Sequence, residues 1–86
     1  MAEQSGVVVH QEPGSAFIVV QHDDGFTLVE LMGHEGMIEV GEAVTGEWTV
    51  EAGAWVITST RLKLDACFQG TWETLSGALA VARNRH

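Results

Sequence analysis

The segment FIVVQHDDGFTLVELM, residues 17–32, decides the fold that this sequence predicts. Two runs rich in β-branched and aromatic residues flank Asp24-Gly25, and Asp-Gly favours a two-residue hairpin turn because both of its central residues adopt positive φ. Pairing across that turn gives two faces, the first with Ile18, Val20, Val29 and Leu31 and the second with Phe17, Val19, Leu28 and Met32. Because both faces are apolar, the hairpin suits a barrel or sandwich in which another segment covers the second face.

Further strand-like segments surround this hairpin. Val7 to Val9 forms a short apolar run before the break at Pro13. From Ala43 the chain alternates with period two, which puts Val44, Gly46, Trp48 and Val50 on one face. After the turn at residues 51–53, an even loop length buries the most apolar surface, so we expect Trp55 and Ile57 on the same face as Trp48.

The segment LKLDACFQ, residues 62–69, shows the clearest alternation in the chain. It predicts a half-buried strand with four inward positions, namely Leu62, Leu64, Ala66 and Phe68. Cys67 then falls on the polar face beside Asp65.

A change to helical spacing follows over residues 72–83, where Trp72, Leu75, Leu79 and Ala82 recur at intervals of three and four. Thr71 is the expected N-cap, and Glu73 falls in the first turn, where an acid suits the helix dipole.

Five or six short antiparallel strands with a terminal helix indicate an all-β fold, a small and partly open barrel of the OB or SH3-like type. The 86 residues allow one domain, 1–86, with a barrel core at 16–70 and a C-terminal helix at 72–83.

The charge distribution limits the classes of partner. Net charge is −8, and residues 1–60 contain ten acids and no Lys or Arg. Such a body repels phosphate backbones and membrane surfaces, so we expect neither nucleic acid nor a membrane as partner. Met1 to Gly6 carries no basic residue, and the apolar stretches are about four or five residues long, whereas a membrane span needs about 20. We therefore expect a cytoplasmic protein.

The segment GEAVTGEW, residues 41–48, has two glycines spaced as in a phosphate-binding loop. That loop must open a helix, whereas this segment alternates like a strand, and Glu47 stands where the motif requires lysine. With Val40 added, the segment VGEAVTGEW (residues 40–48) resembles the V-G-[DE]-x-V-x-G strand of S1-type OB domains. The resemblance implies a barrel. The RNA binding of that family relies on a basic groove, which residues 1–60 do not supply.

Candidate metal ligands gather at two turns, as His22 with Asp23 and Asp24, and as His34 with Glu35. A six-residue strand separates these turns by about 20 Å, so we expect no shared metal site. Cys67, the single cysteine, has no cationic neighbour in the sequence to activate its thiol. We expect no enzyme activity and no cofactor.

The function that this sequence favours is a non-catalytic module for protein interaction or self-assembly, including a homodimer. The predicted interaction surface consists of Phe17, Val19, Phe26, Leu28, Met32 and Trp55. One alternative is a single-stranded nucleic-acid-binding OB module that stacks bases on Phe17, Phe26 and Trp55. A second alternative is a small metal-dependent enzyme at His22/Asp23 or His34/Glu35.

Overall fold

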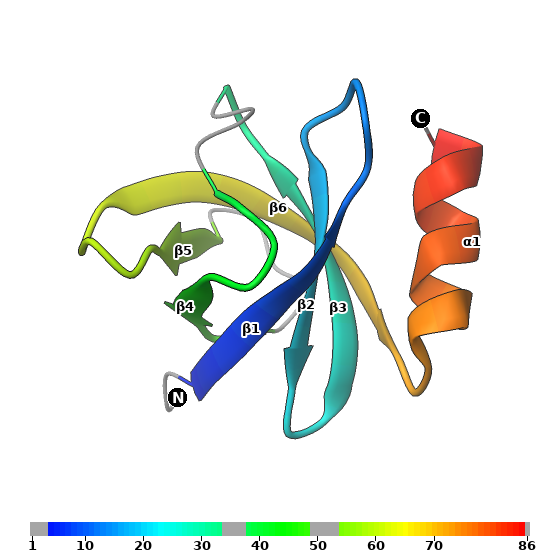
Figure 1. Ribbon diagram of the computed structural model, residues 1–86, viewed down its shortest axis with the longest axis horizontal. Helices are drawn as coiled ribbons and strands as arrows, with labels where there is room; N and C mark the ends of the chain where they lie inside the picture. Colours follow the sequence, from blue (N-terminus) through cyan, green and yellow to red (C-terminus); the bar gives the residue numbers. More distant parts are fainter. Residues whose placement is uncertain (1–3, 34–37, 49–53, 86) are drawn as a thin grey trace.

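Six antiparallel strands and one C-terminal helix make up the described part of the computed structural model, residues 4–33, 38–48 and 54–85. The elements are β1 (Gln4–Gln11), β2 (Phe17–His22), β3 (Gly25–Leu31), β4 (Ala43–Gly46), β5 (Trp55–Ile57), β6 (Lys63–Trp72) and α1 (Leu75–Arg85). The strand order is β1-β2-β3-β6-β5-β4, and pairing of β4 with β1 closes the barrel (Figure 1). This confirms the small all-β barrel with a terminal helix. The barrel is closed rather than partly open, and it begins at β1, ahead of residue 16.

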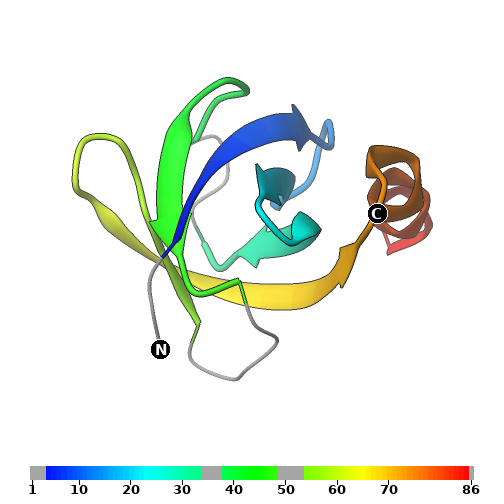
Figure 2. The same ribbon diagram turned by 90° about the horizontal axis from the view of Figure 1, so that it is seen from below.

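The connection from β3 to β4 makes the barrel a Greek key. The strands β1, β2 and β3 follow one another as hairpins, and β4 then returns to lie beside β1. OB-type barrels share this arrangement with five strands, whereas the described residues of this barrel form six. Figure 2 shows α1 outside the ring of strands, next to the end of β6.

The first hairpin has the predicted faces but a different turn. His22 pairs with Gly25, so Asp23 and Asp24 form the turn and the register is shifted by two residues from the predicted one. A shift of two keeps each side chain on its face because the side-chain period is two. Gly25 has φ 133°, and a Cβ there would overlap the backbone oxygen of Trp72.

Apolar side chains form two layers, one inside the barrel and one outside it. The inner layer consists of Val8, Ile18, Val20, Val29, Leu31, Ile38, Val44, Trp48, Val56, Leu64, Ala66 and Phe68. The outer layer lies between α1 and the strands β2, β3 and β6. The two layers use the two apolar faces of the first hairpin, as the alternation predicts.

The segment from Gly41 to Trp48 enters a strand and forms no helix. Gly41 has φ 94° and ends a turn, after which Val44 and Gly46 point into the barrel. Trp48 is 5% exposed, and its Nε1–H donates to the carbonyl oxygen of Gln4 at 2.9 Å. Its φ of 55° is uncommon for a residue other than glycine.

The predicted register of β5 is wrong. Thr45 pairs with Ile57, so Val56 fills the barrel interior while Trp55 and Ile57 point outward. The backbone leaves the extended conformation at Trp48, and strict alternation does not carry across that residue. In β6, Leu64, Ala66 and Phe68 are buried as predicted. Leu62 precedes the strand and is 45% exposed.

The helix begins later than the spacing predicts. Thr71 and Trp72 remain in β6, paired with Thr27 and Phe26, so their backbone belongs to the sheet. Thr74 is the N-cap instead of Thr71, because its Oγ1 accepts the N–H of Gly77 at 3.1 Å. Glu73 lies outside α1, whose first turn holds no acid. Leu75, Leu79 and Ala82 face the outer layer as predicted.

Candidate interaction surface

The second face of the first hairpin lies under α1. The buried residues of this outer layer are Phe17, Val19, Leu28, Ala78 and Ala82. Phe26 packs against the same cluster and is half-buried. The small side chains of the two alanines let the helix approach the sheet closely. Four residues of the predicted interaction surface therefore pack under or beside the helix of their own chain, and this part of the prediction is corrected.

The two remaining residues of that prediction flank the first half of β6 on the outside of the barrel, Trp55 on β5 and Met32 just after β3. Trp55 pairs with Asp65, and Ile57 pairs with Lys63. On the other side of β6, the N–H of Met32 donates to the carbonyl oxygen of Asp65 at 3.0 Å. We call this surface the β5–β6 face, and it comprises Met32, Trp55, Ile57, Lys63 and Asp65.

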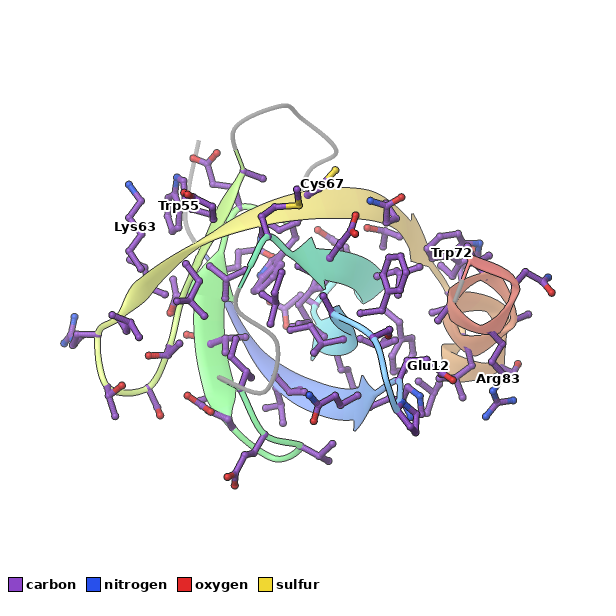
Figure 3. All side chains as sticks on the ribbon, turned by 90° about the horizontal axis from the view of Figure 1, so that it is seen from above. Glu12, Trp55, Lys63, Cys67, Trp72 and Arg83 are labelled. Carbon is purple, nitrogen blue, oxygen red and sulfur yellow. The ribbon has the colours of Figure 1, made fainter. Side chains whose placement is uncertain are left out.

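No described helix or strand lies over the β5–β6 face. The helix contacts β2, β3 and β6 but not β5. Figure 3 shows Trp55 and Lys63 next to each other on the outside of the barrel, across the molecule from Trp72 and α1. Met32 is 51% exposed, and Trp55 is half-buried. Sequence alternation already placed Lys63 and Asp65 outward, but only the β5 register brings Trp55 beside them.

The charges on this face form no ion pair within the described part of the chain. Lys63 Nζ lies 5.3 Å from the centroid of the Trp55 ring, a cation–π contact. Within the described residues the single ion pair joins His10 to Glu12 at 2.9 Å. Arg61 and Lys63 are exposed and form no ion pair with any described carboxylate. These two bases remain available to acids of another molecule.

A groove of about 290 Å³ between β1 and β2 is the second candidate site. Its lining consists of Ser5, Gly6, Val7, Gln21, His22 and Asp23. The His22 ring stacks on Trp48 with centroids 5.4 Å apart and planes at 12°. This stack joins residues far apart in the sequence, and no local pattern predicts it.

Both ring nitrogens of His22 are bonded inside the protein. Nδ1 accepts the N–H of Asp24 at 3.3 Å, so the proton resides on Nε2, which donates to Thr27 Oγ1 at 2.6 Å. The Thr27 hydroxyl also shares a hydrogen bond with the Thr71 hydroxyl at 2.8 Å. Burial lowers the pKa of His22, and the nearby Asp24 and Asp23 offset part of that effect. The neutral ring is thus part of a structural network.

The other candidate residues do not gather into a reactive site in the described part. No three His, Cys, Asp or Glu side chains there are grouped to hold a metal ion, while His34 and Glu35 lie outside the described residues. Cys67 is exposed on the polar face of β6, as predicted, and its Sγ accepts from Gln69 Nε2 at 3.3 Å. Phe17, which was expected to stack bases, is 8% exposed.

Comparison with known proteins matched no family model, no curated protein and no solved structure. Among the described residues no helix is both long and apolar enough to span a membrane. On the surface of this chain, the β5–β6 face combines an outward tryptophan with charges that form no ion pair with any described residue.

Proposed function

We propose that the protein is a non-catalytic protein-interaction module whose contact surface is the β5–β6 face. One observation carries the proposal. The described part of the fold has two outward apolar surfaces, and α1 covers the surface of the first hairpin but not the one with Trp55. Tryptophan is strongly enriched among the residues that dominate protein interfaces, because it combines a large apolar area with few rotatable bonds.

The charges around Trp55 favour a protein over a nucleic acid as the occupant. Asp65 lies directly across from Trp55, and Glu30 lies on the outer side of β3 next to Cys67. A phosphate backbone would meet these acids on a protein of net charge −8. The three aromatic residues expected to stack bases also lie apart, since Phe17 and Phe26 pack with α1 and Trp55 faces the other side.

The experiment compares the wild-type chain with Trp55→Ser. Sedimentation of the purified chain over a concentration series measures self-association. In parallel, a tagged copy in its source cells identifies any partner, which is then purified and mixed with the chain. We expect Trp55→Ser to weaken the complex by about 2 kcal/mol or more, roughly 30-fold in Kd.

Val40→Ser is the matched control, because Val40 is 59% exposed and lies outside the β5–β6 face. It removes an exposed apolar side chain and should leave the complex unchanged. A complex that tolerates Trp55→Ser would overturn the proposal. So would a chain that stays monomeric up to about millimolar concentration and forms no complex with any purified partner.

A further inference from the structure

We infer that the partner of the β5–β6 face is a second copy of this chain, related by a two-fold axis that passes between Lys63 and Asp65. The inference rests on the proposed function and gives it an occupant and a geometry. In this arrangement β6 of one copy runs antiparallel over β6 of the other. Each Lys63 then lies over the Asp65 of its partner.

The order of charges along the face supports a two-fold contact. Arg61 lies just before β6 and Lys63 is the first residue of the strand, whereas Asp65 and Glu30 lie further along the barrel. A two-fold axis that crosses β6 at right angles, in the plane of the contact, brings one end of the strand against the other end of its copy. The basic end therefore meets the acidic end twice in each dimer.

The absence of ion pairs among the described residues of the face strengthens this argument. Arg61 and Lys63 pair with no described carboxylate, although acids outnumber bases by twelve to four in the chain. The acid of the face is equally unengaged, since the Asp65 side chain forms no ion pair with a described base. Each copy thus offers both halves of a complementary pair.

The apolar residues fit the same axis. Trp55 lies on the β5 side of β6, and Met32 lies on the β3 side. An axis that sets the two β6 strands antiparallel reverses the order along the strands and keeps the β5 side of one copy over the β5 side of the other. Trp55, which is level with Asp65, then lies over Ile57 of the partner, which is level with Lys63. A parallel arrangement of the two β6 strands would instead set Lys63 against Lys63.

The size of the face predicts a weak dimer. Its three strands span about 15 Å at about 4.8 Å per strand, so a square patch of that width covers about 200 Å², well below the roughly 800 Å² per partner of a standard interface. We therefore expect a concentration-dependent dimer with a Kd in the micromolar range or weaker. Measurements need to reach high micromolar protein at about 0.15 M salt, so that repulsion between the acidic bodies is screened.

A charge-swap experiment tests the axis directly. Lys63→Glu places a carboxylate over the Asp65 of the other copy, and Asp65→Lys places an ammonium group over its Lys63, so each variant alone meets two like-charge contacts. We expect each to dimerise at least about tenfold more weakly than the wild type. In an equimolar mixture, the two substituted side chains pair with each other, and the retained Lys63 of one variant pairs with the retained Asp65 of the other. Sedimentation of this mixture should show a restored heterodimer.

Two control variants separate this effect from a change in net charge. Arg83→Glu changes the charge as Lys63→Glu does, and Glu73→Lys changes it as Asp65→Lys does. Both positions are exposed and lie off the face, on α1 and just before it. Both controls should dimerise like the wild type. Far-ultraviolet circular dichroism confirms that every variant is folded.

The outcomes distinguish the inference from the proposed function. If the mixture of charge variants stays monomeric while the wild type dimerises, the two-fold axis is wrong. If the wild type is monomeric yet loses a different purified partner on Trp55→Ser, the second copy is wrong and the interaction module stands. If Trp55→Ser weakens neither self-association nor binding of a purified partner, both the dimer and the interaction module on the β5–β6 face are wrong.

Discussion

Substitution of Gly25 by alanine should destabilise the barrel more than any other alanine at a described glycine of positive φ. Gly25 has φ 133°, where a side chain costs about 1–3 kcal/mol in backbone strain. A Cβ would also overlap the backbone oxygen of Trp72, which belongs to the neighbouring strand and cannot rotate away. Such overpacking adds about 1–3 kcal/mol. The sum, about 2–6 kcal/mol, is a large part of the roughly 5–15 kcal/mol typical of whole domains.

Two other glycines separate these contributions. Gly33 has φ 79° with nothing within 4 Å of its Cβ position, so Gly33→Ala measures backbone strain alone. Gly6 has no positive φ, but its Cβ would lie 2.5 Å from Val20 Cγ1 and 2.8 Å from the oxygen of Gln21, so Gly6→Ala measures crowding alone. Urea unfolding followed by tryptophan fluorescence gives the three free energies of unfolding. A cost for Gly25→Ala equal to that of Gly33→Ala would refute the role of the Trp72 contact.

Two further predictions concern the His22 network and the helix cap. Burial holds the pKa of His22 below its ordinary value of about 6.5, so the unfolded chain takes up a proton first as the pH falls. The free energy of unfolding should therefore decrease from about pH 7.5 to about pH 5 in urea titrations. His22→Gln should reduce this dependence of the free energy of unfolding on pH, whereas the control His10→Gln should leave it unchanged. An unchanged pH dependence in His22→Gln would contradict a role for His22. Thr74→Ala should lower stability by about 1 kcal/mol, since Thr74 caps α1. Thr74→Ser should restore most of that loss, and a Ser variant as unstable as the Ala variant would exclude the cap.

Period-two alternation predicted the parts of the fold that depend on one strand or one hairpin. The first hairpin contributes Val20 to the barrel interior and Val19 to the layer under α1, although its turn is Asp23-Asp24. An error of two residues in register leaves the faces unchanged, so the predicted faces are correct although the predicted turn residues are not. The inward positions of β6 follow for the same reason.

Contacts between residues far apart in the sequence determine where α1 begins and which sheet it covers, and the sequence pattern did not predict either. The helix starts after Trp72 because pairing of Trp72 with Phe26 extends β6 by three residues beyond the predicted end of the strand at Gln69. The same extension brings α1 over the first hairpin and removes Phe17 from the surface. Helical spacing indicates which side chains a helix buries, but not which sheet receives them.

The register of β5 decides which tryptophan points outward. Trp48 and Trp55 are seven residues apart, and unbroken alternation through an even loop placed both inside the barrel. At Trp48 the backbone has φ 55°, and the indole stacks between His22 and Phe68 while donating to the Gln4 carbonyl. With that space filled, Val56 is the β5 side chain that the interior accommodates, and Trp55 must point outward beside Lys63. Trp48 lies inside the barrel as the alternation predicts, whereas the pairing of Thr45 with Ile57 puts Val56 inside and Trp55 outside, and the β5–β6 face exists because of that register.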